Sequence, residues 1–140
     1  MSRTTQLETY NRTRVQTADR GQLLLMVYDA AIRFTREARR RIEDGDTVGK
    51  GVMIDKAYAA VAELRKTLDI EQGQEIARSL DRLYAYLLRQ ITLSNIKSDA
   101  GALTVVLQIL EDLRNTWEQV IEQEDGTRRG GSRPSGELSL

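Results

Sequence analysis

Cysteine and histidine are both missing from this 140-residue sequence. Without cysteine the chain has no disulfide bond and no thiolate nucleophile. Without histidine it lacks the commonest general base and the commonest ligand of transition metals. A serine–histidine catalytic triad and the Glu-x-x-His di-iron site of many helical bundles are therefore excluded.

Proline and long apolar runs are also scarce. The one proline, Pro134, lies near the C-terminal end, so no proline interrupts residues 1–123. Few stretches alternate β-branched and polar residues, which argues against a β fold. The longest apolar run, residues 23–28, is far too short to span a bilayer, and the polar first residues are not those of a signal peptide. We therefore expect a cytoplasmic protein with no membrane insertion.

The charge balance and the glycine pattern exclude further classes. The 21 basic residues equal the 21 acidic ones, so no overall basic field favours nucleic acid as a partner. The Gly-Lys-Gly sequence at 49–51 lacks the preceding strand and the spacing of a phosphate-binding loop. Tyr28, Tyr58 and Tyr84 are expected to pack at helix edges with their phenols outward rather than to act as acids. We predict that the protein is not an enzyme and has no catalytic, cofactor or metal site.

Apolar residues recur at steps of three and four, the spacing of one helix face, in four stretches. These stretches lie near residues 19–44, 51–69, 74–96 and 100–123. The connections between them are short, so consecutive helices should run antiparallel. The sequence therefore predicts an all-α fold, an antiparallel up-down four-helix bundle.

The first predicted helix is more apolar than one buried face requires. Asp19 is its candidate N-cap. Its stripe comprises Leu23, Val27, Ala30, Phe34, Ala38 and Ile42. Leu24, Met26 and Tyr28 lie off this stripe, so we expect something else to cover them.

Three interpretations of this apolar excess stay open, because periodicity does not separate them. The excess could form a generous core with a homodimer seam, so that the protein is a structural homodimer. It could instead form grooves that receive an apolar helix of another protein. A carboxylate-metal or ligand-binding enzyme built on a bundle is the third interpretation.

Composition divides the chain into three parts. Residues 1–18 are polar and precede the first helix, and residues 19–123 form the predicted bundle. Residues 124–140 are rich in Gly, Ser and Arg and keep no apolar period, which predicts a disordered tail. The first part is either a disordered terminus or a strap that lays Tyr10 and Val15 on the bundle, and periodicity alone favours the former.

One ordered set of residues resembles the flagellin-export chaperone family, FliS. A tyrosine, a Thr-Ala cap and a leucine-rich helix with Met and Tyr-Asp open the family pattern, as do Tyr10, residues 15–18 and residues 23–29 here. Later matches include Gly73-x-x-Ile76-Ala77, Leu80-x-x-Leu83-Tyr84-x-Tyr86, Asn95, Asp99 and Trp117. The resemblance covers about residues 8 to 123. The departures are Arg20 for a proline, Ala30 for a glycine and Ser94 for an alanine, and none removes an apolar groove residue.

The resemblance implies a cytoplasmic chaperone with a four-helix bundle. Such proteins bind the disordered C-terminal segment of flagellin, prevent premature polymerisation and help to deliver flagellin to the export gate. The family's N-terminal segment lies back on the bundle, which implies an N-terminal strap role for Tyr10, Val15 and Thr17. Helical faces predict that the flagellin groove is lined by Ile54, Tyr58, Tyr84, Leu88, Val105 and Ile109.

Overall fold

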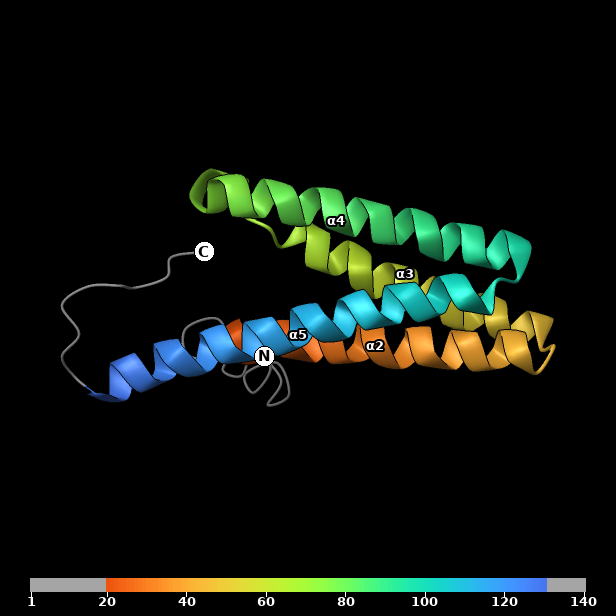
Figure 1. The fold of residues 1–140 in the computed structure, drawn as a ribbon, viewed down its shortest axis with the longest axis horizontal. Coiled ribbons are helices and arrows are strands. Elements are labelled where there is room, and N and C mark those ends of the chain that lie inside the picture. The colour runs from red at the N-terminus through yellow and green to blue at the C-terminus, as the bar shows by residue number, and fades with distance from the viewer. Residues whose placement is uncertain (1–19, 131–140) are drawn as a thin grey trace, which may run out of the picture.

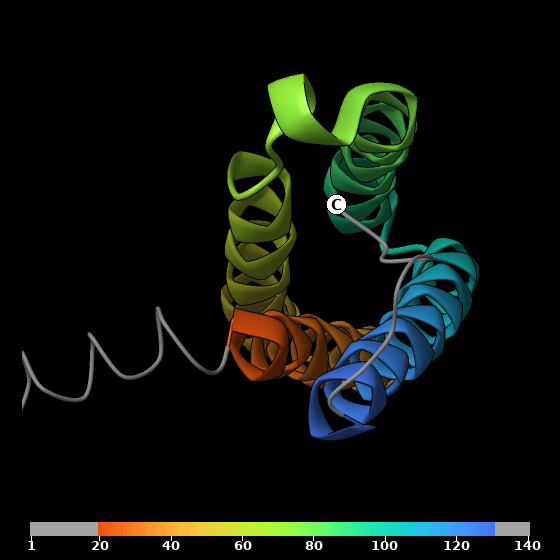
Figure 2. The same ribbon diagram turned by 90° about the vertical axis from the view of Figure 1, so that its left-hand side faces the viewer.

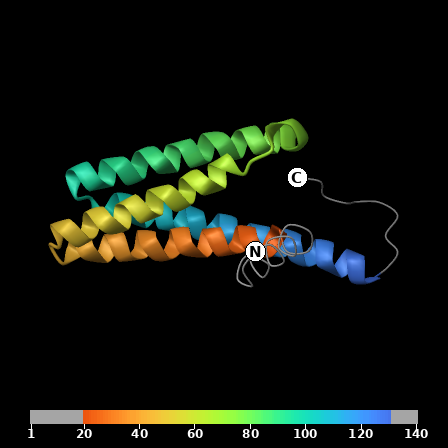
Figure 3. The ribbon, with the colours of Figure 1, turned by 180° about the vertical axis from the view of Figure 1, so that it is seen from behind.

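The protein is all-α in the computed structural model, which describes residues 20–130. Four long helices follow one another along the chain (Figure 1): α2 (Arg20–Glu43), α3 (Thr47–Lys66), α4 (Ile70–Lys97) and α5 (Ala100–Gly130). Both α2 and α4 pack against α3 and α5, so the helices form a ring when viewed from one end (Figure 2). Seen from behind, consecutive helices run in opposite directions (Figure 3). The predicted antiparallel four-helix fold is confirmed. None of the described helices is long and apolar enough to cross a membrane.

Aspartate side chains cap the starts of α3, α4 and α5. The capping carboxylates accept hydrogen bonds from backbone amides three residues later, over 2.9 Å at Asp46, 3.2 Å at Asp69 and 3.1 Å at Asp99. These bonds satisfy amides that have no partner within the helix. The cap predicted for α2, Asp19, lies outside the described residues.

Helices α4 and α5 are longer than the apolar pattern predicts, and α3 begins earlier. Both α3 and α4 begin directly after their capping aspartates, before the first residue of their predicted stripes. Within α4, Gln74 has a non-helical backbone with φ of 48° and ψ of −121°, which sets the first turn apart from the rest. Helix α5 continues to Gly130, so residues 124–130, which the composition assigns to the tail, are helical.

Of the predicted stripe of α2, only Ala38 is fully buried, while Val27 and Ile42 pack against the core as partly buried residues. Tyr28 has no exposed surface, whereas Leu23 is 45% exposed. The residues of α2 that the core buries are Leu25, Tyr28, Ala31, Ile32, Thr35 and Ala38. They also recur at steps of three and four, but they lie on a neighbouring face of the helix. The prediction that Tyr28 lies off the core is therefore wrong, because its hydroxyl group finds a partner on a distant helix.

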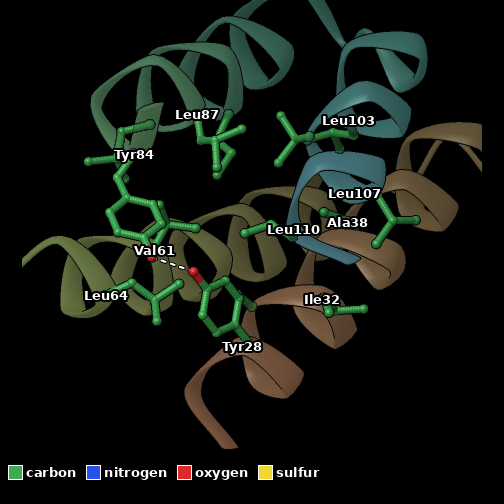
Figure 4. Packing of buried hydrophobic residues seen from close by; sticks show 14 of the residues in the cluster. Tyr28, Ile32, Ala38, Val61, Leu64, Tyr84, Leu87, Leu103, Leu107 and Leu110 are labelled. Carbon is green, nitrogen blue, oxygen red and sulfur yellow. Dashed lines mark hydrogen bonds between the residues drawn. The ribbon is translucent and has the colours of Figure 1, made fainter. Parts of the chain in front are cut away.

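The predicted stripe of α5 is confirmed in its first half. Leu103, Val106 and Leu110 have no exposed surface. Leu113 and Trp117 continue the stripe as partly buried residues that pack against the same core. Figure 4 shows side chains of all four helices meeting in this cluster.

The buried lysine near the start of α3 fastens the end of α4. The ammonium group of Lys50 donates hydrogen bonds to the carbonyl oxygen of Asn95 over 3.1 Å and to Oγ of Ser98 over 2.9 Å. Ser98 ends α4 in the left-handed region, with φ of 48°. A cation at this position satisfies a terminal carbonyl group and opposes the negative end of the helix dipole.

Candidate partner-binding surface

Three of the six predicted groove residues lie in the core. Ile54, Tyr84 and Leu88 are all buried, and Tyr84 is only 1% exposed. The assumption that these side chains lie off the core is wrong, because each belongs to the face that its helix turns toward the bundle axis. A partner could contact them only if the helices separated.

Tyr58 is exposed on the flank of the bundle where α3 meets α4. It precedes Arg65 by seven residues, which places both on one face of α3. The Arg65 guanidinium pairs with Asp81 of α4 over 2.7 Å, so this face of α3 is the one beside α4. The hydrogen bond from Arg65 lowers the pKa of the Asp81 carboxyl group.

Val105 and Ile109 lie on a different flank. Val105 is 48% exposed and Ile109 is partly buried. Arg114 of α5 pairs with Asp29 of α2 over 2.9 Å, and Val105 lies nine residues before Arg114, on the opposite side of α5. Val105 and Ile109 therefore face away from α2 and toward α4. The structure does not bring Tyr58 together with them, so the six predicted residues do not form one continuous groove.

A second set of exposed apolar side chains accompanies Val105 and Ile109. Tyr86 and Leu93 are exposed, and each follows a buried residue of α4 by two positions, so both lie on the outer face of α4. Because α4 runs antiparallel to α5, they lie level with this part of α5. We define the α4–α5 apolar surface as Leu80, Tyr86, Leu93, Val105, Ile109, Leu113 and Trp117. The predicted groove does not include the members on α4, because apolar spacing within one helix does not show which of its apolar residues stay exposed in the bundle.

The α4–α5 seam differs from the neighbouring seams in its polar contacts. The ion pair between Asp29 and Arg114 joins α2 to α5, and the pair between Arg65 and Asp81 joins α3 to α4. Among the side chains that the structure describes, no ion pair joins α4 to α5. Figures 1 and 2 show these two helices diverging from their shared turn. The seam therefore offers apolar contact area with few polar links that a partner would have to break.

Two tyrosines meet beneath this surface. The hydroxyl groups of Tyr28 and Tyr84 are hydrogen-bonded to each other (Figure 4). The indole N–H of Trp117 donates to the hydroxyl oxygen of Tyr28 over 3.1 Å. Burial raises the pKa of both phenols above the usual value, so both stay protonated at ordinary pH. The prediction that these two phenols point outward is wrong.

The remaining predicted functional residues are not placed by the structure. Tyr10, Val15 and Thr17 lie outside the described residues. Among the described side chains, no group of three or more acidic residues is arranged to hold a metal ion.

The chain is similar to flagellar proteins. The family model described as "Flagellar protein FliS" matches residues 3–124. The flagellar secretion chaperone FliS of Bacillus subtilis is 35% identical over 121 residues, which cover 86% of this chain and 90% of that protein. The proteins of the same name from Salmonella typhimurium and Vibrio cholerae are 36% and 29% identical over 107 and 118 residues. These matches cover 76% and 81% of this chain, and 79% and 87% of the two relatives.

Proposed function

This chain belongs to the FliS family of flagellar proteins, and on that basis we propose that it is a flagellar secretion chaperone that binds flagellin for export. It acts in the cytoplasm on the C-terminal segment of flagellin, prevents premature polymerisation and assists delivery to the export gate. The observation that carries the proposal is the family match over most of the chain, together with an apolar surface that an amphipathic helix could cover.

The α4–α5 apolar surface is the proposed docking site. An amphipathic segment of flagellin would otherwise use its apolar stripe to join another subunit, and a bundle that covers the stripe blocks this contact. A disordered segment that folds on binding spends part of its contact energy on ordering, which keeps the complex releasable. Val105 and Ile109 contribute to this surface directly, whereas Tyr58 would contact only a segment that extends around α4.

The N-terminal segment is the proposed competitor for the partner. Tyr10, Val15 and Thr17 are the strap residues that the family resemblance implies. A short tether keeps such side chains at a high effective concentration near the bundle, on the order of millimolar. The Tyr10→Ala variant should therefore bind flagellin more tightly, and unchanged affinity together with unchanged amide exchange on α2 would contradict the strap.

Calorimetry with a peptide from the C-terminal segment of flagellin tests the proposal. We expect 1:1 binding with a negative heat-capacity change, the marker of apolar burial. Binding that disappears in moderate salt and shows no heat-capacity change would contradict it. If the protein without peptide has the mass of a dimer in solution and does not bind the peptide, the structural homodimer would be favoured.

Two exposed valines provide a matched pair for locating the site. Val105 on α5 is 48% exposed and Val52 on α3 is 45% exposed. The Val105→Ser variant should weaken peptide binding about five-fold, since covering half a valine side chain contributes about 1 kcal/mol. The Val52→Ser variant should bind like the unmodified chain. Equal effects of the two changes would place the docking site elsewhere.

A further inference from the structure

A hydrogen bond crosses the bundle between helices that are not neighbours in the ring. Tyr28 belongs to α2 and Tyr84 to α4, and each of these helices packs against α3 and α5. The two phenols point toward each other through the core, and both are fully or almost fully buried (Figure 4). Their contact therefore fixes the distance across the bundle diagonal, which backbone packing between adjacent helices leaves less constrained.

The same oxygen also fixes a third helix. The hydroxyl oxygen of Tyr28 accepts the indole N–H of Trp117, so α2, α4 and α5 meet at one group. Since no ion pair of the described residues links α4 to α5, this network relates the positions of the two helices through the core. Trp117 is partly buried and packs against the core cluster, and it is also a member of the α4–α5 apolar surface, so one residue belongs to both the network and that surface.

We propose that Tyr28, Tyr84 and Trp117 are positioning residues that hold α4 and α5 at the spacing that the flagellin segment requires. The proposal rests on the function proposed above. We call the hydrogen-bonded network of these three side chains the brace. Without the brace, α4 would occupy a wider range of positions relative to α5. Fewer molecules would then have the binding-competent spacing, and the apparent affinity falls in proportion to that fraction.

Conservative variants test the brace through affinity. Tyr28→Phe and Tyr84→Phe keep the ring and remove one hydroxyl group. Each should weaken binding of the C-terminal flagellin peptide about five-fold, the factor that one net hydrogen bond is worth. The double variant should bind no more weakly than Tyr28→Phe, because Tyr28→Phe already removes both hydrogen bonds of this hydroxyl group, the one with Tyr84 and the one from Trp117. Val52→Ser is the control, since Val52 is exposed on α3 outside the proposed docking site, and it should bind normally.

A distance measurement separates positioning from general stability. The chain has no cysteine, so Arg89→Cys with Gln108→Cys places one spin label on the exposed face of α4 and one on that of α5. Pulsed EPR on the full chain should give a broader distance distribution in the Tyr84→Phe background, and the peptide should narrow it again. Circular dichroism checks that each variant keeps its helices.

Two results would overturn the inference. One is a distance distribution between the two spin labels that is as narrow with Tyr84→Phe as it is in the labelled chain that keeps Tyr84. The other is full multiplication of the two single-variant affinity losses in the double variant, which would mean that the hydroxyl groups act independently. Failure of the unmodified chain to bind the peptide would instead contradict the proposed function, and the distance measurement without peptide would still decide whether the brace exists.

Discussion

The two buried phenols give the stability of the protein a defined dependence on high pH. Burial raises the pKa of Tyr28 above that of a tyrosine in the unfolded chain, about 10. A raised folded-state pKa means that the favourable contribution is complete below about pH 10 and declines at higher pH. In urea titrations from pH 8 to 11 we expect the midpoint to fall above pH 10, and to fall less steeply in Tyr28→Phe. If the urea midpoints of the unmodified chain and of Tyr28→Phe fall equally steeply, groups other than Tyr28 control the loss of stability at high pH.

A second residue, Gln74, has a backbone conformation that glycine adopts more easily. Its φ of 48° and ψ of −121° interrupt α4, and such conformations cost a non-glycine residue about 1–3 kcal/mol. We expect Gln74→Gly to raise the free energy of unfolding by about 1 kcal/mol in urea denaturation. Glu75→Gly, one residue further into the helix, should lower it by about 1 kcal/mol. If both changes destabilise the chain equally, Gln74 is not strained.

At the scale of single helices, two hydrogen bonds from Lys50, here called the Lys50 clasp, join the start of α3 to the end of α4. Its ammonium group is buried and donates to both Asn95 and Ser98. Lys50→Met keeps much of the volume but leaves these acceptors without their donor, so we expect a loss of about 2 kcal/mol in unfolding free energy. Hydrogen exchange should increase mainly at the end of α4. Lys66→Met, on the exposed last turn of α3, should have little effect, and an equal loss there would contradict the clasp.

The helices show which features local sequence can predict. The stripe of α5 follows directly from its sequence, because the apolar spacing that begins at Leu103, Val106 and Leu110 continues through Leu113 and Trp117. Helix α2 offers two neighbouring apolar faces, and its own sequence does not decide between them. Tyr84, which lies 56 residues after Tyr28, decides which face of α2 is buried. Its hydroxyl group is a hydrogen-bond partner for the Tyr28 phenol and offsets the cost of burying it.

The candidate surface was predictable only in part for the same reason. Val105 and Ile109 are off the α5 stripe and were identified from spacing alone. Ile54 and Leu88 also looked peripheral, but the apolar sector that each helix buries is wider than one stripe. Which flank stays exposed depends on how far apart α4 and α5 pack, and no single helix encodes that distance.

For the whole molecule, the end of α5 sets the limit of the folded unit. Gly21 lets α2 approach α5 closely, since a Cβ atom at Gly21 would lie 2.9 Å from Ile121. The family match also ends nearby, at residue 124. A chain ending at Gly130 should keep the melting temperature and the peptide affinity of the full chain. A chain ending at Val120 loses the contact of Ile121 with α2 and should melt lower, and equal melting temperatures would show that this contact contributes nothing.

The ion pair between Asp29 and Arg114 has a consequence for the order of folding. These residues are 85 positions apart, whereas the other helix pairs of the ring are joined by short turns. Closing a long loop costs more chain entropy than pairing across a turn, so we expect α5 to dock on α2 after the rate-limiting step. Arg114→Ala should then speed unfolding in stopped-flow experiments and leave the refolding rate nearly unchanged. A slower refolding rate would place this contact in the transition state. During synthesis, the first three helices can associate before α5 leaves the ribosome, so a nascent chain acquires its partner-binding seam last.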